Sequence, residues 1–205
     1  MDTSSDSDLG RPRTGAALLR ESVTMTIRQA MFDELAEAGY ARMSMEAVTR
    51  RAGVGKAALY RRWPSKEAMV VGLVSEAAAE HIPTTTDTGS LRGNVERFVK
   101  ETMDSLRHPL VGRIIPDLLA ESARNSTLHE ALHLAVLAPR RAAVSMLLHR
   151  AADRGELPPD IDEGLAIDLF GAPLYFRMLA VGGPTDDAYV SRLTNAIVAA
   201  ISASH

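Results

Sequence analysis

The chain contains no cysteine and few aromatic residues. Without cysteine it has no disulfide framework, no thiolate metal site and no thiol nucleophile. Only 4% of the residues are aromatic, while 46% are apolar, mostly Ala, Leu, Val and Met. This balance favours helices, because strands prefer β-branched and aromatic side chains. We therefore predict a globular, all-α protein.

The chain also lacks the usual marks of export and membrane insertion. Its first residues include Asp2, Asp6 and Asp8, and they have neither the basic nor the apolar region of a signal peptide. The longest apolar run of the C-terminal part, Leu169–Phe176, contains Pro173 and is far too short to span a bilayer. We expect a soluble, cytoplasmic protein with no membrane partner.

Positive charge is concentrated in one segment of an acidic chain. The formal net charge is −3, yet residues 40–66 carry seven bases against one acid, Glu46. Such a segment indicates contact with phosphate, although a solvated pair of basic helices would have the same charge. The seven bases are Arg42, Arg50, Arg51, Lys56, Arg61, Arg62 and Lys66.

Capping and turn residues divide this basic segment into short helices. Ser44 is a good N-cap for a helix over Met45–Arg51, and Gly53 permits the φ > 0 geometry of a sharp turn. A second helix is predicted over Lys56–Trp63, because Pro64 keeps the residue before it out of the α region. The pattern predicts a helix-turn-helix.

The second predicted helix has two different faces. Leu59 and Trp63 lie one turn apart, so both can face inward. The opposite face carries two cations, a phenol hydroxyl and a small residue, which suits a helix in the major groove of DNA. Lys66 begins the next helix, where N–H groups and a cation favour a phosphate. We assign DNA contact to Ser44, Lys56, Ala57, Tyr60, Arg61 and Lys66.

These residues resemble a known family. The pattern consists of Ala30, Leu35, Gly39-Tyr40, Ser44-Met45 and the unbroken run from Ala52 to Glu67. Over roughly residues 18–75 it resembles the DNA-binding domain of the TetR family of bacterial transcriptional regulators. One departure is Gly55, where the family usually has Ser or Thr at the N-cap of the recognition helix; glycine is a tolerated cap.

The resemblance implies a fold and a mechanism. It implies nine helices, with a small-molecule effector bound in the C-terminal domain and a homodimer that binds a palindromic operator. We expect a flexible arm over residues 1–15, in which Arg11 and Arg13 resemble a minor-groove arm. The DNA-binding domain is assigned to residues 16–82 and the effector-binding and dimerisation domain to residues 83–205, with a boundary where Ile82–Ser90 lacks an apolar period.

The rest of the chain is also predicted to be helical. The helices flanking the helix-turn-helix are expected over Ala16–Ala38 and from Ser65 to about His81. Pro139 is expected to kink or split one C-terminal helix, and Asp160 is expected to cap another, which reaches about Val181. The C-terminal helices are Leu91–Leu106, Val111–Ala123, Thr127–Arg154, the helix opened by Asp160, and Thr185–Ala203.

One motif points to a different class of protein. His129, Glu130 and His133 match the HExxH pattern of zinc metalloproteases, in which histidines at i and i+4 share a helix face. Thr127 and Glu130 also have the spacing of a capping box, which explains the glutamate without chemistry. No third ligand follows at a recognisable spacing. We expect solvated histidines, with no catalytic residue, metal or cofactor.

Two further sites are assigned to the C-terminal domain. An adaptable, methionine-containing set of residues on the middle helices suits an effector cavity, although ordinary core residues would have the same character. The last two helices are assigned to a dimer interface, since a palindromic operator requires a two-fold protein; they too could be internal core. The cavity residues are Phe98, Met103, Leu106, Leu110, Ile114, Leu118, Met146, His149 and Tyr175. The interface residues are Leu169, Phe170, Ala172, Met178, Leu193, Ile197, Ala200 and Ile201.

Together these features predict a homodimeric, ligand-responsive transcriptional repressor. Its expected partners are double-stranded operator DNA and a small-molecule effector whose identity the sequence does not give. The alternatives are a metal-dependent hydrolase that uses the two histidines, and a helical interaction module that binds no DNA.

Overall fold

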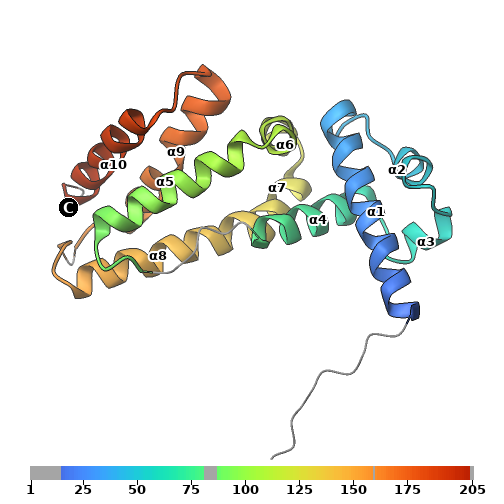
Figure 1. The fold of residues 1–205 in the computed structure, drawn as a ribbon, viewed down its shortest axis with the longest axis horizontal. Coiled ribbons are helices and arrows are strands. Elements are labelled where there is room, and N and C mark those ends of the chain that lie inside the picture. Colours follow the sequence, from blue (N-terminus) through green and yellow to red (C-terminus); the bar gives the residue numbers. More distant parts are fainter. Residues whose placement is uncertain (1–14, 81–86, 159, 204–205) are drawn as a thin grey trace, which may run out of the picture.

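The structure is a computed structural model, and it describes residues 15–80, 87–158 and 160–203, with side chains from residue 22 onward. Every regular element in these ranges is helical. Figure 1 shows an elongated molecule in which α2 and α3 lie at one end and α10 at the other. Residues 1–14 of the predicted arm lie outside the described residues, and Gly15 already begins α1.

The N-terminal part consists of four helices close to the predicted positions: α1 (Gly15–Ala38), α2 (Met45–Ala52), α3 (Lys56–Tyr60) and α4 (Lys66–Glu80). The predicted extent of the recognition helix was wrong, since α3 ends three residues before Trp63. Pro64 explains the difference, because Trp63 is kept out of the α region. The chain closes instead with a turn in which Arg62 N–H and Trp63 N–H both donate to the Leu59 carbonyl, at 2.9 and 3.0 Å.

The C-terminal part contains the remaining helices, two of which change from α- to π-helical pitch. They are α5 (Leu91–Arg107), α6 (Pro109–Ser122), α7 (Ser126–Leu132), η1 (His133–Leu137), α8 (Ala138–Asp153), α9 (Glu163–Tyr175), η2 (Phe176–Val181) and α10 (Asp187–Ser202). Because α7, η1 and α8 form one continuous helix, as do α9 and η2, the described part of the chain has nine helices. This confirms the all-helical fold.

Two predicted helix starts were wrong. Thr127 lies inside α7, and the N-cap is Asn125, whose side chain accepts a bond from Leu128 N–H at 3.0 Å. The cap of α9 is Asp162 rather than Asp160, since Asp162 accepts from Leu165 N–H at 3.0 Å. In both cases, several residues with capping ability stand close together in the sequence, and spacing alone does not choose between them.

Pro139 produces the expected disturbance in a specific form. Proline has no N–H, so the carbonyl four residues earlier, that of Ala135, loses its helical partner. The Ser75 hydroxyl of α4 donates to this carbonyl at 3.0 Å, and the helix takes π-helical pitch over His133–Leu137. As a result α4 is joined to the middle of the long helix.

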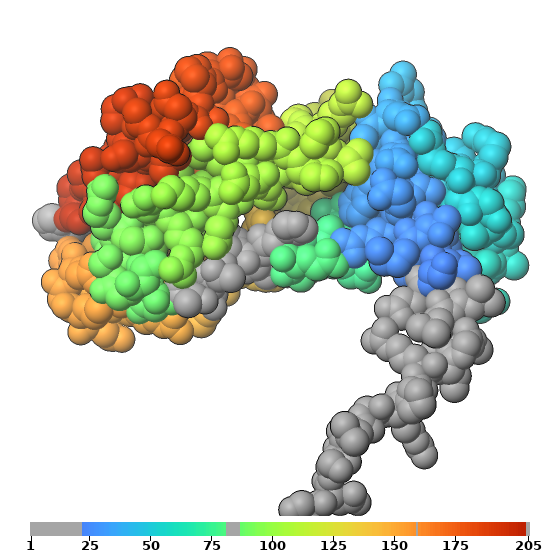
Figure 2. All heavy atoms as spheres, in the orientation of Figure 1, coloured from blue at the N-terminus to red at the C-terminus, as the bar shows by residue number. Residues whose placement is uncertain are grey.

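The buried apolar residues form two cores. The first combines α1–α4 with Ile114 and Leu118 of α6 and Leu128 of α7. The second lies among α5, α8, α9 and α10, around Phe170, whose ring meets that of Phe98 edge-on with centroids 5.2 Å apart. Figure 2 shows α6 directly against α1. The helix-turn-helix therefore shares its core with helices from the C-terminal half.

Two helices leave much of their apolar surface exposed. Ser126–Asp153 and Glu163–Val181 are long and apolar enough to cross a membrane by length and composition alone, and only 22% and 17% of their most apolar windows are buried. The sequence-based expectation considered only uninterrupted apolar runs and did not identify these helices. The most exposed large apolar residues on them are Leu134 and Phe176, at 64% and 66%.

Candidate nucleic-acid interface

The helix-turn-helix is fixed by caps and by buried residues. Ser44 has extended backbone geometry, and its Oγ accepts a bond from Ala47 N–H at 3.1 Å. Gly53, with φ +65°, ends α2, and its N–H is directed back to the last carbonyls of that helix. Val48 and Leu59 have no exposed surface. Together these contacts set the angle between α2 and α3.

The recognition helix has the expected two faces. Leu59 lies in the first core, and Trp63 packs against it while remaining partly exposed. The ring lies against α4 at Gly72, where a Cβ would be 3.5 Å from the indole Nε1, an ordinary van der Waals distance. On the opposite face, Lys56 and Ala57 are exposed, and Tyr60 is 41% exposed.

Several cations of the basic segment hold the domain together. Arg42 Nε donates to the Ala38 carbonyl at 2.9 Å, at the end of α1. Arg51 binds Glu37 at 3.0 Å and lies 3.2 Å from Glu34, which joins α2 to α1. The hydrogen bond to Glu37 is the main reason that the pKa of Arg51 lies above its ordinary value. These two charges counted toward the basic segment that indicated phosphate contact, although neither was assigned to DNA, and their partners are within the protein.

Other cations face solvent. Arg50 and Arg61 are exposed, and their guanidinium groups have no hydrogen-bond or ion-pair partner among the residues that the structure describes. Lys56 pairs with Glu46 at 3.2 Å, with both side chains well exposed. Arg50 is a candidate that the sequence reasoning missed; its position on the exposed side of α2 is not evident from charge alone.

Lys66 is partly buried and has a partner within the protein. Its Nζ donates to the Tyr40 carbonyl at 2.8 Å and lies 4.3 Å from the centre of the Tyr40 ring. The lysine thereby holds the start of α4 against the turn between α1 and α2. An ammonium group has three donors, so a phosphate contact is still compatible with this bond and stays a prediction.

The same turn is held from the other side by α6. Tyr40 N–H donates to Asp117 Oδ2 at 2.7 Å. Gly39 has φ +77°, and a Cβ there would lie 2.7 Å from Asp117 Oδ1. Glycine is therefore needed at position 39 both for the backbone conformation and for the approach of Asp117. Sequence reasoning did not identify Asp117, because its partner is 77 residues away.

The residues assigned to an effector cavity lie in separate places. Phe98 and Met103 belong to the second core and Ile114 and Leu118 to the first. The side chains of Met146 and His149 are directed to solvent; Met146 is 45% exposed. Leu106 is buried, Leu110 packs against the first core, and the Tyr175 hydroxyl accepts a bond from Arg140.

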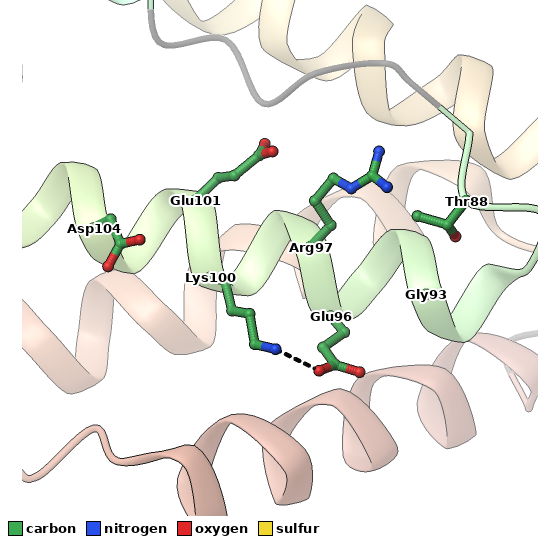
Figure 3. A pocket seen from close by; sticks show the side chains of 7 residues that line it. All are labelled: Thr88, Gly93, Glu96, Arg97, Lys100, Glu101 and Asp104. Carbon is green, nitrogen blue, oxygen red and sulfur yellow. Dashed lines mark hydrogen bonds and ion pairs between the residues drawn. The ribbon is translucent and has the colours of Figure 1, made fainter.

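Two hollows lie away from most of these residues. One runs along the outer face of α5, and Figure 3 shows its charged lining, including the ion pair between Lys100 and Glu96. A second lies between α5 and the start of α10, where Met103 is the one assigned residue in its lining. Both have charged walls, unlike the mostly apolar pockets that hold small ligands. The effector site stays a prediction.

The assigned dimer interface is divided between core and surface. Phe170, Ile197 and Ile201 are buried in the second core, so their side chains support α9 and α10 from inside. Leu169, Met178 and Leu193 pack partly against that core, while Ala172 and Ala200 are exposed. The large exposed apolar residues of this region are Leu165, Phe176 and Val181.

The two histidines of the HExxH motif share one helix face, as predicted. Their rings stack with centroids 6.4 Å apart, and both residues are exposed. Within the described ranges, no three His, Cys, Asp or Glu side chains are grouped closely enough to hold a metal ion. The capping-box explanation of Glu130 was wrong, since Asn125 is the N-cap.

Both halves of the chain match models of one protein family. Residues 27–73 match the family model described as "Bacterial regulatory proteins, tetR family", and residues 85–197 match "Tetracyclin repressor-like, C-terminal domain". A DNA-binding transcriptional repressor TetR of Mycobacteroides abscessus is 32% identical over 89% of this chain and 90% of its own length. The uncharacterised HTH-type regulator YdeS of Bacillus subtilis is 29% identical over 90% and 89%.

A solved structure agrees along most of the chain. The TetR family transcription regulator SCO0332 has a TM-score of 0.67 and 28% identity, and the match covers 87% of this chain and 97% of that one. Both halves of the sequence thus match the same family, and the fold matches a solved member of it. The chain belongs to the TetR family and is a non-enzymatic, DNA-binding transcriptional regulator.

Proposed function

We propose that the chain is a homodimeric repressor that binds a palindromic operator and leaves it when a small-molecule effector binds. The observation that carries the proposal is the division of the helix-turn-helix into an anchored and a free surface. Leu59 is wholly buried, whereas Lys56, Tyr60 and Arg61 are exposed. A helix fixed from behind in this way presents its outer side chains to a major groove.

Repression is supported by a relative. The Mycobacteroides abscessus protein, which is 32% identical, is a transcriptional repressor by name. Because a repressor acts where the DNA lies, we expect this chain to act in the bacterial cytoplasm.

A dimer is supported by the exposed face of the helix Glu163–Val181. Leu165, Ala172 and Phe176 have helical spacing, so they lie along one stripe, and all three are exposed. On α10 the exposed Ala196 and Ala200 are one turn apart and would allow another helix to pack closely. A second copy related by a two-fold axis would cover both surfaces in a four-helix bundle.

Effector control is supported by the connection between α6 and the DNA-binding helices. Ile114 and Leu118 lie in the first core, and Asp117 holds Tyr40 N–H. A ligand that moves α6 would therefore move the helix-turn-helix and change the distance between the two recognition helices of a dimer. Solved relatives of the same fold include FadR of Bacillus subtilis with stearoyl-CoA and the flavonoid-responsive regulator FrrA, at 16% and 19% identity. Small acyl or aromatic compounds are the first effectors to screen.

The test compares two matched lysine variants on operator DNA. Lys56 and Lys100 are both exposed and both paired with a glutamate, the first on the proposed recognition surface and the second on α5. Lys56→Ala should weaken binding to the chain's own upstream DNA about fivefold or more, and Lys100→Ala should leave it unchanged. Fluorescence anisotropy would measure both. If the parent protein binds this DNA no better than random DNA, the proposed function is wrong.

A further inference from the structure

Glu46 is the one acidic residue in the basic segment of the chain, and it lies on the recognition surface. It stands in the first turn of α2, is about half exposed, and accepts a bond from Lys56 of α3 at 3.2 Å. Its pKa is lowered by a bond from its own backbone N–H, by Lys56 and by the Tyr60 hydroxyl. Glu46 is thus held ionised beside two residues assigned to DNA contact.

Other nearby acids have structural partners away from this surface. Glu34 and Glu37 bind Arg51 between α1 and α2, and Glu80 binds Arg28 through both oxygens at 2.7 Å. Glu46 contributes no such link between α1 and its neighbours. Glu46 pairs with Lys56, which would otherwise be available to a phosphate of DNA. The charge of Glu46 itself repels the DNA backbone. A negative charge in this place lowers affinity for DNA in general.

A C·G base pair presents a hydrogen-bond donor next to acceptors in the major groove, which complements the acceptor Glu46 and the donor Lys56. In the major groove the cytosine N4 amino group is a donor, and O6 and N7 of the paired guanine are acceptors. Glu46 is an acceptor and Lys56 a donor, and they lie side by side. Adenine also offers an amino donor, but its N7 acceptor stands next to that donor on the same base and would repel a carboxylate.

We propose that Glu46 is a specificity-determining residue, which accepts a hydrogen bond from cytosine N4 while Lys56 donates to the guanine of the same base pair. At an A·T pair the amino donor is flanked by two acceptors, adenine N7 and thymine O4, and in the remaining orientations the carboxylate meets an acceptor or an apolar edge. At these pairs Lys56 stays bound to the carboxylate. The pair thereby penalises DNA that lacks the C·G pair. This inference rests on the proposed function, since it assumes operator binding through α3.

The experiment selects binding sites from a randomised DNA pool with the full-length protein and three variants. Glu46→Gln replaces one carboxylate oxygen by an NH2 donor and removes the charge that holds Lys56, so the side chain no longer rejects base pairs that offer acceptors. Lys56→Met removes the donor. Glu96→Gln is the matched control, because Glu96 also pairs with a lysine, at 2.6 Å, but on α5 (Figure 3). Affinities of all four proteins for the selected site and for random DNA follow by anisotropy over a range of salt concentrations.

The parent should enrich a two-fold motif with a C·G pair at one position of each half-site. Glu46→Gln should lose preference at that position alone, bind the selected site about fivefold more weakly or worse, and bind random DNA about two- to fivefold more tightly. Its salt slope on random DNA should steepen by about one per protomer. Lys56→Met should relax the same base pair, and Glu96→Gln should select the parental motif.

Three results would overturn the inference while leaving operator binding intact. They are an unchanged motif for Glu46→Gln, an equal relaxation by Glu96→Gln, and relaxation of a different base pair by Lys56→Met. If the parent enriches no motif, both the inference and the proposed function fail.

Discussion

At the scale of single residues, the recognition helix separates residues that hold it from residues that project from it. Leu59 is fully buried, Trp63 is half-buried against the first core, and Tyr60 is 41% exposed. Substitutions on the two sides should therefore fail in different ways. This difference is the most direct check of the face assignment.

Tyr60→Ala should leave the melting temperature almost unchanged, since surface substitutions usually fall within about 0.5 kcal/mol. It should weaken operator binding by about 1–3 kcal/mol if the hydroxyl and ring contact DNA. Trp63→Ala removes a partly buried ring and should destabilise the domain by up to about 3 kcal/mol, lowering melting and binding together. Thermal melting and anisotropy of both variants test this; equal loss of stability would refute the face assignment.

Lys66→Ala should have two effects. Loss of the 2.8 Å bond to the Tyr40 carbonyl should lower stability by about 1–2 kcal/mol. Loss of the predicted phosphate contact should weaken binding to all DNA alike and reduce the salt slope by about one. Binding to operator and random DNA at several salt concentrations measures the second effect. A loss confined to the operator would show that Lys66 contacts a base.

At the scale of helices, the turn between α1 and α2 is the point where three elements meet. Tyr40 donates to Asp117 of α6 through its N–H and accepts from Lys66 of α4 through its carbonyl. The residue is 4% exposed, so neither bond is readily replaced by water. The position of the helix-turn-helix thus depends on a helix outside it.

Asp117→Ala should leave the Tyr40 N–H without its acceptor, at a cost of about 1–3 kcal/mol. Hydrogen exchange at that amide should become faster, and affinity for a full palindrome should fall more than affinity for a half-site, because only the palindrome requires a fixed spacing. Asp117→Asn retains an acceptor oxygen and should behave like the parent. Unchanged exchange at Tyr40 in the alanine variant would contradict the link.

The stability of the region around the N-terminal end of α5 should depend on pH. The pKa of Asp87 is lowered chiefly by Asn94, and the pKa of Glu156 chiefly by Arg154 and by Leu91 N–H, which donates at 2.6 Å. Because the folded protein favours the ionised forms, the unfolded chain binds more protons in acid. The stabilisation therefore begins to be lost as the pH falls below 4.5 for Glu156 and below 3.8 for Asp87, and it is gone once the pH is below their lowered pKa values in the folded protein. Asp87→Asn combined with Glu156→Gln should flatten the acid side of the stability profile measured by urea unfolding.

The sequence predicted helices well where one strong signal marked each end. Ser44 and Gly53 cap as expected, and Pro139 disturbs its helix. Prediction failed where several capping residues compete, as at Asn125 and Thr127. It also failed for Asp117, since a bond between residues 77 positions apart leaves no periodic pattern.

The same limit applies to the candidate sites. Counting charges identified the basic segment. It did not show that Arg51 is bound to α1, whereas the guanidinium of Arg50 has no partner among the described residues. Apolar spacing identified α9 and α10 but not which side is internal, so Phe170 and Ile201 were assigned outward although both have no exposed surface. Burial depends on packing between helices that a local pattern does not contain.

At the scale of the whole molecule, the exposed apolar stripe of the helix Glu163–Val181 predicts where two copies meet. Phe176 and Leu134 are almost equally exposed, at 66% and 64%, on two different helices. Phe176→Glu should weaken dimerisation at least tenfold, because a charge would be buried in the interface, and Leu134→Glu should not. Analytical ultracentrifugation of both variants decides; the reverse order would place the interface on Ser126–Asp153.

The shared first core has a consequence for building hybrid regulators. Grafting residues 16–82 onto a foreign sensor would remove Ile114, Leu118 and Leu128 from the core that they complete, together with the carboxylate that holds Tyr40. The graft would then expose an apolar surface to solvent, and its helix-turn-helix would be held less firmly. A transplantable module of this protein has to include α6 and α7, or a recipient whose own helices reproduce their contacts, so its unit of exchange is larger than the unit that touches DNA.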